Sequence, residues 1–229
     1  MARAILVRHG QSVSNADPRS ASIPTEVGDR LTDKGREQAR AVAGFLPNHG
    51  PTLLLTSPMR RARETAEIVN EELGLPCREL DYIHELRESD EYQHLAPEEQ
   101  KLQRWSVRMA EHAEDPDHSP EGGESFNDVL GRVLRFKTEL KELGDAGEVP
   151  LAITHGLFLR FFLAHSFLGD ELGPRHAARL WQMRSLNCGI SVFEAGERWH
   201  AVDPDIPGWS CITWMARPWD PPPIPVNRS

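Results

Sequence analysis

Cysteine is scarce in this chain, and its spacing excludes two kinds of site. Only Cys77, Cys188 and Cys211 occur among the 229 residues, and they lie far apart. An odd number of separated cysteines without a CxxC pair argues against a disulfide framework and against a zinc knuckle. We therefore expect buried free thiols.

Long apolar runs and an excess of positive charge are also missing. The apolar run at residues 4–7 is too short for a signal-peptide core, and no other run approaches the ~20 residues of a membrane-spanning helix. The formal net charge is -9, from 26 Lys and Arg against 35 Asp and Glu, so the average surface repels nucleic acid and anionic lipid. We expect a cytoplasmic protein without nucleic-acid or membrane partners, in which an anionic ligand needs a locally basic pocket.

Apolar runs of strand length alternate with segments of helical period along the chain. This alternation predicts an α/β three-layer sandwich, with a mostly parallel central sheet and helices on both faces. We expect one catalytic domain over residues 1–219, in which the polar, acidic stretch 85–120 forms a lid or insertion over the site. Residues 220–229 are rich in proline and are expected to form an extended tail.

The expected elements follow from these patterns. Strands are predicted at residues 4–7, 52–56, 77–80 and 149–153. Helices are predicted at residues 32–46, from Ser57-Pro58 to about Gly74, at 126–143 and at 157–167, the first with Thr32 or Asp33 as N-cap and ended by Pro47. Residues 190–194 and 198–202 resemble a hairpin, which gives the sheet an antiparallel edge.

Two of the predicted strands end in a histidine followed by a glycine. The two motifs are Arg8-His9-Gly10 and Thr154-His155-Gly156. Ligands bind at the carboxyl ends of strands in open α/β sheets, and parallel neighbouring strands would bring the two imidazoles together. The pattern therefore predicts a site at this edge of the sheet.

The helix that follows the strand at 52–56 carries Arg60 and Arg61 in its first turns. Basic side chains at this end oppose the helix dipole. An anion bound there would offset that unfavourable interaction, because helix N-termini and guanidinium groups both suit phosphate oxygens. The histidines and arginines together predict a pocket for a small anion.

The chain resembles the histidine phosphatase superfamily, which has the phosphoglycerate mutase-like fold. The resemblance runs from residue 3 to about residue 195 and depends on five motifs taken together. These motifs are LVRHGQS (6–12), LTDKGREQA (31–39), TSPMRRARETA (56–66), GES (123–125) and THG (154–156).

The resemblance implies a phosphatase in which His9 forms a covalent phosphohistidine. Its attacking nitrogen must be unprotonated, so the other ring nitrogen should donate to a backbone carbonyl. The resemblance further implies a clamp of Arg8, Arg61 and His155 around the phosphoryl oxygens, with added hydrogen bonds from Ser12 and Asn15. Neither a cofactor nor a metal is expected, since the remaining histidines lack a ligand spacing such as HExxH.

The general acid has three candidates. Family members carry it in a Leu-x-Glu pattern, which Leu86-Arg87-Glu88 matches, so Glu88 is the first choice. Glu85 lies three residues earlier and would share a helical face with Glu88. Glu124 in the GES motif is the third. Asn187 could line the pocket, but an asparagine in a turn is the simpler account.

The superfamily also contains mutases, so three functions are considered, of which hydrolysis is expected. The first is a phosphomonoester hydrolase for a small phosphorylated metabolite. The second is a phosphoglycerate mutase-type phosphotransferase, but mutases of this fold carry a Tyr-Gly-x-Leu-x-Gly-type segment where this chain has an acidic stretch from Ser89. The third is a non-catalytic relative that binds phosphorylated ligands. A homodimer is possible in each case.

Overall fold

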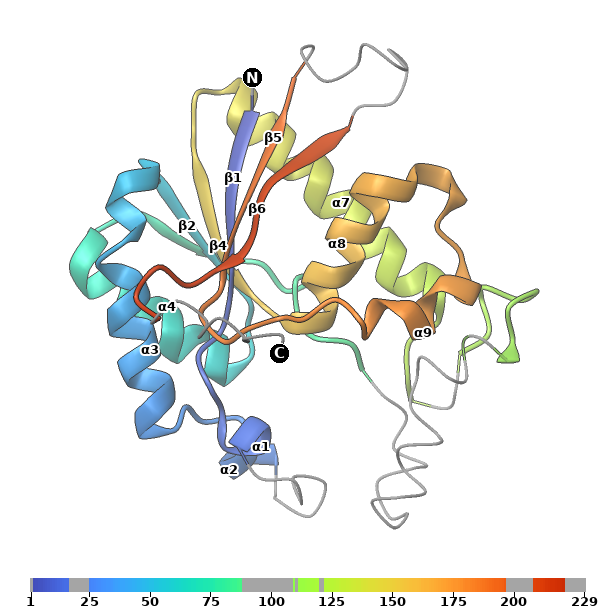
Figure 1. Ribbon diagram of the computed structural model, residues 1–229, viewed down its shortest axis with the longest axis horizontal. Coiled ribbons are helices and arrows are strands. Elements are labelled where there is room, and N and C mark those ends of the chain that lie inside the picture. The colour runs from blue at the N-terminus through green and yellow to red at the C-terminus, as the bar shows by residue number, and fades with distance from the viewer. Residues whose placement is uncertain are drawn as a thin grey trace, which may run out of the picture.

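A six-stranded sheet forms the centre of the computed structural model, which describes residues 2–16, 25–87, 109, 111–119, 122–196 and 208–220 (Figure 1). The sheet has the order β3-β2-β4-β1-β5-β6. Its strands are β1 (Ala2–Arg8), β2 (Leu53–Thr56), β3 (Cys77–Glu79), β4 (Pro150–Thr154), β5 (Ile190–Ala195) and β6 (Trp209–Ala216).

Parallel pairing dominates the sheet. β3, β2, β4 and β1 run parallel, whereas β5 is antiparallel to both β1 and β6. The predicted antiparallel edge is confirmed. The strand that pairs with β5 is β6, however, which the sequence did not predict, and the expected partner at 198–202 lies outside the described residues.

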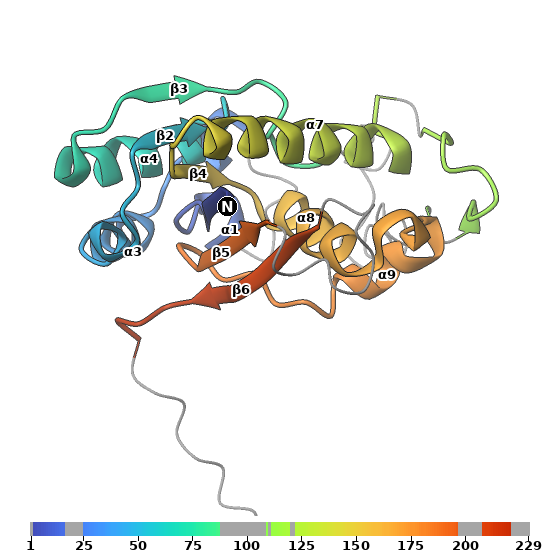
Figure 2. The same ribbon diagram turned by 90° about the horizontal axis from the view of Figure 1, so that it is seen from above.

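Helices cover both faces of the sheet, as Figure 2 shows with α3 and α4 on one side and α7 and α8 on the other. This arrangement confirms the three-layer α/β sandwich. The α-helices are α1 (Val13–Ala16), α2 (Thr25–Gly28), α3 (Asp33–Ala43), α4 (Arg60–Leu73), α7 (Phe126–Asp145), α8 (Gly156–Leu168) and α9 (Ala177–Leu180). Short 3-10 helices occur at Leu46–His49, Gly169–Glu171 and Pro174–His176.

Residues of β1 alternate between the two cores. Ile5 and Val7 pack against the α3 and α4 side, where Val42 is fully buried. Leu6 packs on the other side in a cluster that includes Phe136 of α7. Because both faces are covered, β1 reads as a continuous apolar run rather than an alternating one. The strand is thereby fixed as a rigid base for the residues that follow it.

The start of α3 agrees with the prediction, but its end does not. The Thr32 side chain caps the helix by accepting from the backbone N–H of Gly35 (3.0 Å). The α-helix ends at Ala43, three residues before the predicted end, because Pro47 lies in the first turn of a separate 3-10 helix. Proline suits the first turn of a helix, where it forfeits no backbone hydrogen bond.

The cysteines are free thiols, but only one is buried. Cys188 is buried, Cys211 is partly buried and Cys77 is exposed, so the expectation of buried thiols holds for Cys188 alone. In the part of the chain that the structure describes, no helix is both long and apolar enough to cross a membrane.

Two predicted segments fall largely outside the described residues. In the predicted lid at 85–120, the structure does not describe residues 88–108, 110 and 120. In the proline-rich tail it does not describe residues 221–229. The division into one domain of residues 1–219 and a tail stays a prediction.

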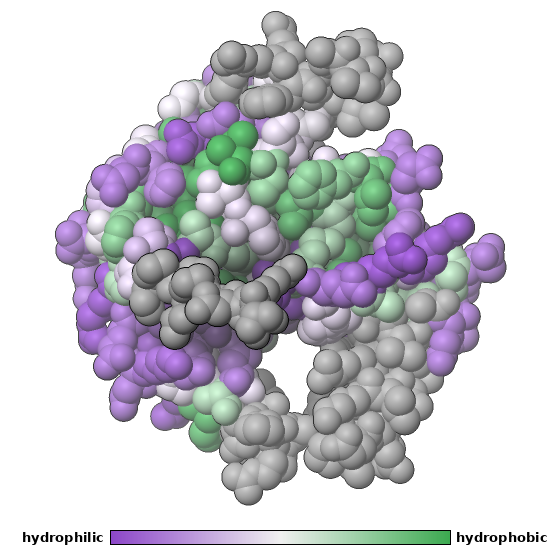
Figure 3. Space-filling view, in the orientation of Figure 1, coloured by the Kyte–Doolittle hydropathy of each residue, from purple (hydrophilic) through white to green (hydrophobic). Residues whose placement is uncertain are grey.

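Apolar side chains are exposed over α8 and β6, where Figure 3 shows hydrophobic surface. Phe167 and Leu168 at the end of α8 and Ile212 on β6 are exposed. A groove nearby is lined by Leu163, Met183, Arg184, Leu186, Trp214 and Met215. Such surface is typical of contact regions, but the possible homodimer stays a prediction.

Candidate active site

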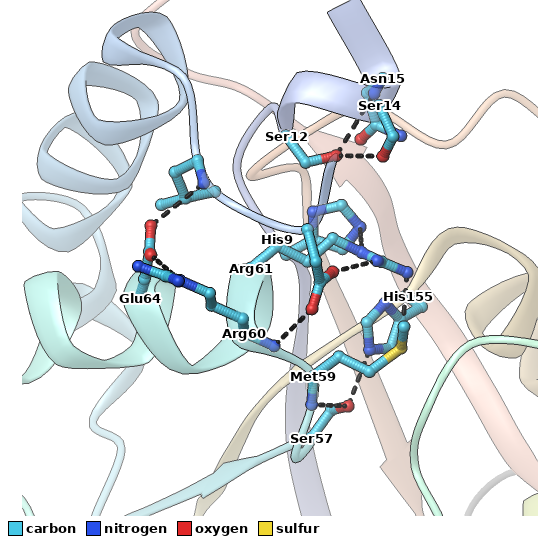
Figure 4. A network of polar contacts seen from close by, with 12 residues as sticks. His9, Ser12, Ser14, Asn15, Ser57, Met59, Arg60, Arg61, Glu64 and His155 are labelled. Atoms are coloured by element: carbon cyan, nitrogen blue, oxygen red, sulfur yellow. Dashed lines mark hydrogen bonds and ion pairs between the residues drawn. The ribbon is translucent and has the colours of Figure 1, made fainter. Parts of the chain in front are cut away.

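The carboxyl ends of β1, β2 and β4 meet at one edge of the sheet and carry the residues of the site (Figure 4). Arg8 pairs in register with Thr154, and the backbone N–H of His9 donates to the Thr154 carbonyl (2.9 Å). The ring centroids of His9 and His155 lie 5.1 Å apart. The parallel pairing of β1 with β4 thus brings the two imidazoles together, as predicted.

His9 has a contact on each ring nitrogen that defines its tautomer. Its Nδ1 lies 2.7 Å from the Gly10 carbonyl, and its Nε2 lies 3.0 Å from Nε of Arg61. A guanidinium only donates, so Nε2 must accept and Nδ1 carries the proton. Nε2 therefore holds a lone pair, which is the state that a nucleophilic histidine needs.

Burial keeps both imidazoles neutral. His9 is 1% exposed and His155 is fully buried. Burial holds the pKa of His9 well below its usual value, and the charges of Arg61 and Arg8 add to that effect. The pKa of His155 is likewise held well below its usual value by burial and then by Arg61. Both side chains are consequently uncharged at neutral pH, with one ring proton each.

Arg8 is held in place by neighbours but leaves its buried Nε–H unused. Its Nη1 donates to the Ser185 carbonyl (2.6 Å) and its Nη2 to Oδ1 of Asn15 (3.3 Å). Among the described residues its buried Nε has no hydrogen-bond partner. A Cβ at Gly156 would lie 3.2 Å from this atom, so the absence of a side chain there leaves Nε its space.

His155 also has a buried ring nitrogen without a partner. Its Nε2 lies 2.7 Å from Ser57 Oγ, which also accepts from the backbone N–H of Met59 (3.3 Å). The Ser57 hydroxyl can then donate to Nε2, and in that arrangement Nδ1 of His155 carries the ring proton. Within the described residues nothing accepts from Nδ1. Buried donors without partners are rare, and the pair on Arg8 and His155 fits a ligand with acceptor oxygens.

Arg61 forms an ion pair that sequence reasoning missed. Its Nη1 contacts Oδ1 of Asp29, and both side chains are almost buried. The other carboxylate oxygen accepts from the backbone N–H of Arg60 (2.7 Å). The anion expected at the start of this helix is therefore present as a side chain. The basic first turn of the helix indicated that a negative charge lies nearby, but the sequence did not show which acidic residue supplies it.

The predicted cap of the same helix is wrong. α4 begins at Arg60 after Met59, not at Ser57-Pro58, and no side chain of Met59 caps it. The Ser57 hydroxyl is engaged instead with His155, and Asp29 satisfies the N–H of Arg60. The predicted end at Gly74 is correct, since this residue has the left-handed conformation typical of a C-cap (φ 62°).

Ser12, Asn15 and Asn187 lie around the site in different roles. Ser12 is fully buried, contacts Ser14 Oγ (3.0 Å) and accepts from the backbone N–H of Asn15 (3.3 Å). Asn187 donates from Nδ2 to the His9 carbonyl (3.0 Å) and contacts Asn15 Oδ1 (3.3 Å). Asn187 thus lies in a turn, as the sequence favoured, and the structure also places its side chain against the backbone of His9.

The three acid candidates are not equivalent. Glu88 lies outside the described residues. Glu124 is almost fully buried, and Arg132 donates to both of its carboxylate oxygens (2.8 and 2.9 Å). Glu85 accepts from the backbone N–H of Leu157 (3.2 Å), next to the start of α8. Burial lowers the pKa of Arg8, and the negative charge of Glu85 opposes that shift, which puts this carboxylate within electrostatic reach of Arg8.

Metal binding has no obvious place in the part of the chain that is described. No group of three or more His, Cys, Asp or Glu side chains that could hold a metal ion occurs there. The groups around His9 are cationic or neutral donors, a set suited to an anion rather than to a cation.

The chain belongs to the histidine phosphatase superfamily (branch 1), whose family model matches residues 4–203. A probable phosphoglycerate mutase GpmB of Yersinia enterocolitica is 32% identical over 195 residues, which is 83% of this chain and 84% of the relative.

Solved structures show the same fold. A mycobacterial glucosyl-3-phosphoglycerate phosphatase in complex with VO3 has a TM-score of 0.67 at 21% identity, over 94% of this chain and 100% of that chain. A putative alpha-ribazole-5'-P phosphatase from Escherichia coli has a TM-score of 0.68 at 22% identity, over 94% and 97%.

Proposed function

We propose that this chain is a phosphomonoester hydrolase that acts through a covalent phosphohistidine on a small phosphorylated metabolite. The observation that carries the proposal is the lone pair on His9 Nε2 beside three cationic or donor groups. Arg61 contacts this atom directly (3.0 Å), while Arg8 and His155 each have a buried nitrogen without a partner in the described chain. Together they suit the oxygens of a phosphoryl group.

In the first step Nε2 of His9 attacks phosphorus and the bond to the substrate oxygen breaks. The leaving alkoxide takes a proton from a general acid. Arg8, Arg61 and His155 would stabilise the charge on the phosphoryl oxygens, a task that metal ions perform in many phosphoryl-transfer sites.

In the second step water attacks the phosphohistidine. The same acid, now a carboxylate, takes a proton from the water, the bond between Nε2 and phosphorus breaks, and inorganic phosphate leaves. His9 and the general acid thereby return to their starting protonation states.

Among the described residues, we propose Glu85 as the general acid, and Glu88, the first choice from the sequence, stays the other candidate because it lies outside them. The contact of Glu85 with the first turn of α8 holds its carboxylate beside the strand end that delivers His155. Glu124 is less suitable because it is almost fully buried and its charge is already paired with Arg132.

A mutase-type phosphotransferase is the second candidate. It is favoured by the 32% identity to a probable phosphoglycerate mutase, whereas the structural relatives cited above carry the names of phosphatases. The two reactions differ in whether water or a second hydroxyl accepts the phosphoryl group. Hydrolysis is preferred because the acidic stretch after Glu88 is unsuited to a second anionic group.

A cytoplasmic location also stays a prediction.

The test compares the wild type with His9→Asn in buffer containing EDTA. We expect the wild type to hydrolyse p-nitrophenyl phosphate and to incorporate acid-labile phosphate, and the variant to do neither. His49→Asn is the matched control, because His49 contacts Arg3 at the opposite end of β1. Full turnover by His9→Asn would contradict the proposal. Interconversion of 3- and 2-phosphoglycerate faster than hydrolysis would favour the mutase.

A further inference from the structure

The N-terminus of α4 is capped by a residue from elsewhere in the chain. α4 has no acidic residue in its first turn and no side-chain cap of its own, and it begins with Arg60 and Arg61. Asp29 supplies what is missing. One carboxylate oxygen accepts from the N–H of Arg60 (2.7 Å) and the other pairs with Arg61. A negative charge here interacts favourably both with the helix dipole and with the guanidinium of Arg61.

All three nitrogens of Arg61 are engaged in this state of the protein. Nη1 contacts Asp29, Nη2 lies 3.5 Å from Met59 Sδ, and Nε donates to Nε2 of His9 (3.0 Å). Figure 4 shows Arg61 reaching from α4 to the ring of His9. The hydrogen bond to Nε2 covers the lone pair that has to attack phosphorus. Arg61 must therefore exchange this contact for a phosphoryl oxygen before the reaction proceeds.

The two residues that follow Asp29 anchor its segment to the rest of the site. The N–H of Val13 donates to the Arg30 carbonyl (2.9 Å), and the N–H of Leu31 donates to the carboxylate of Glu64 (3.0 Å). Glu64 in turn pairs with Arg60 (2.7 Å). Asp29 is thus held against α4 by its neighbours, and it stays near Arg61 when an anion enters the pocket.

We propose that Asp29 is a positioning residue that acts as the resident counter-ion of Arg61 and weakens the hold of the pocket on inorganic phosphate. It keeps the guanidinium pointed at His9, and its negative charge repels the phosphate that the second step leaves behind. Phosphate and Asp29 share one arginine, so the product leaves more readily. This role rests on the proposed hydrolase function.

The deciding experiment uses Asp29→Asn, in which the amide oxygen still accepts from the N–H of Arg60 while the charge is lost. We expect the inhibition constant of inorganic phosphate to fall about tenfold, because one repulsive unit charge is removed from a poorly solvated site. We also expect kcat to fall, because the neutral amide holds Arg61 less firmly. Affinity and turnover therefore change in opposite directions.

A merely structural role would give a different pattern. If Asp29 only supports the fold, Asp29→Asn weakens phosphate binding together with kcat, and that result would overturn the proposal, as would an unchanged inhibition constant. Asp33→Asn is the matched control, since Asp33 is an exposed acid in the first turn of α3. Asp29→Ser, which is small and neutral and also offers an acceptor oxygen, repeats the test if the asparagine variant does not fold.

Failure of the hydrolase function is recognisable separately. A wild type that turns over no phosphomonoester would contradict the function itself. A wild type that is active, beside an Asp29→Asn variant with unaltered or weaker phosphate inhibition, would remove only the role of Asp29.

Discussion

The carboxylate of Glu85 accepts from the backbone N–H of Leu157 through both of its oxygens (3.2 and 3.3 Å). Leu157 is the second residue of α8 and follows directly on His155 and Gly156. A negative charge is favoured at this end of a helix, where backbone N–H groups have no intrahelical partner. Glu85 is thereby tied to the strand end that carries His155.

Glu85→Gln is expected to lower kcat for an alkyl phosphate such as glycerol phosphate by roughly 10²–10⁴-fold, the usual contribution of general acid catalysis. The loss should be smaller for p-nitrophenyl phosphate, because nitrophenolate leaves without a proton. Acid-labile phosphoenzyme should accumulate, since the water of the second step loses its base. Rapid-quench measurement of both quantities checks the assignment. A normal Glu85→Gln beside an inactive Glu88→Gln would return the role to Glu88.

Glu124→Gln should affect stability rather than chemistry. Arg132, whose side chain is mostly buried, donates to both Glu124 oxygens and to the carbonyls of Tyr82 and His84 (2.8 and 3.0 Å). Removing one partner of such a pair leaves the other charge buried, which costs about 3–5 kcal/mol. We expect that loss in urea denaturation, with kcat per folded molecule unchanged. A loss of kcat in the folded variant, comparable to that of Glu85→Gln, would speak for Glu124 as the acid.

Two glycine-to-alanine changes should shift stability in opposite directions. A Cβ at Gly35 in α3 would lie 2.1 Å from the backbone oxygen of Gln11, which must then move. We expect Gly35→Ala to destabilise the protein by about 1–3 kcal/mol despite the better helix propensity of alanine. Gly131 in α7 is the control, since a Cβ there meets nothing within 4 Å. Gly131→Ala should stabilise by ~0.5–1 kcal/mol in the same urea titrations. Equal changes in the free energy of unfolding for the two variants would show that the backbone at Gln11 moves aside without a cost in stability.

The parts of the site that follow from local pattern were predictable. His9 and His155 each come directly after a buried apolar run, and the parallel pairing of those runs decides that the rings meet. Thr32 likewise caps α3 through a hydrogen bond to Gly35, three residues away. Patterns of this range contain the information within a few residues of the chain.

The parts that depend on distant pairing were not predictable. Asp29 meets Arg61 across 32 residues and Asn187 meets His9 across 178, so neither pairing leaves a local trace. β6 was missed for a different reason. Its pairing with β5 has register shifts, and Met215 has a positive φ of 54°, so the strand lacks a regular alternation of buried and exposed side chains.

Lys137 is a buried lysine between α7 and α8, away from the site residues. Its Nζ contacts Nδ1 of His165 and Oγ of Ser166 (both 2.9 Å) and lies 4.7 Å from the centre of the Phe162 ring. The side chain is 8% exposed, and burial lowers the pKa of Lys137 to about 7. Burial and the charge of Lys137 lower the pKa of His165 to about 4. The lysine is therefore easily deprotonated in the folded protein.

This pKa predicts a stability that depends on pH above neutrality. The pKa of Lys137 in the folded protein lies below its ordinary value of 10.5, so between about 7 and 10.5 the unfolded chain binds a proton that the folded chain does not. Stability therefore rises with pH across this window, by up to about 1.4 kcal/mol per pH unit from this group. Below about pH 7 both states are protonated, and the destabilisation is complete.

Lys137→Met should remove this dependence. We expect the difference in free energy of unfolding between variant and wild type to favour the variant at pH 7 and to shrink as the pH approaches 10. Lys141→Met is the matched control, since Lys141 lies one turn along α7, has a side chain that is 45% exposed and pairs with Asp145 (2.6 Å). The difference in free energy of unfolding between Lys141→Met and the wild type should stay near zero at every pH, because exposed pairs of this kind contribute only ~0.3–0.5 kcal/mol. If the curve for Lys137→Met is equally flat, Lys137 keeps an ordinary pKa, and the contacts to His165 and Ser166 stabilise its charged form.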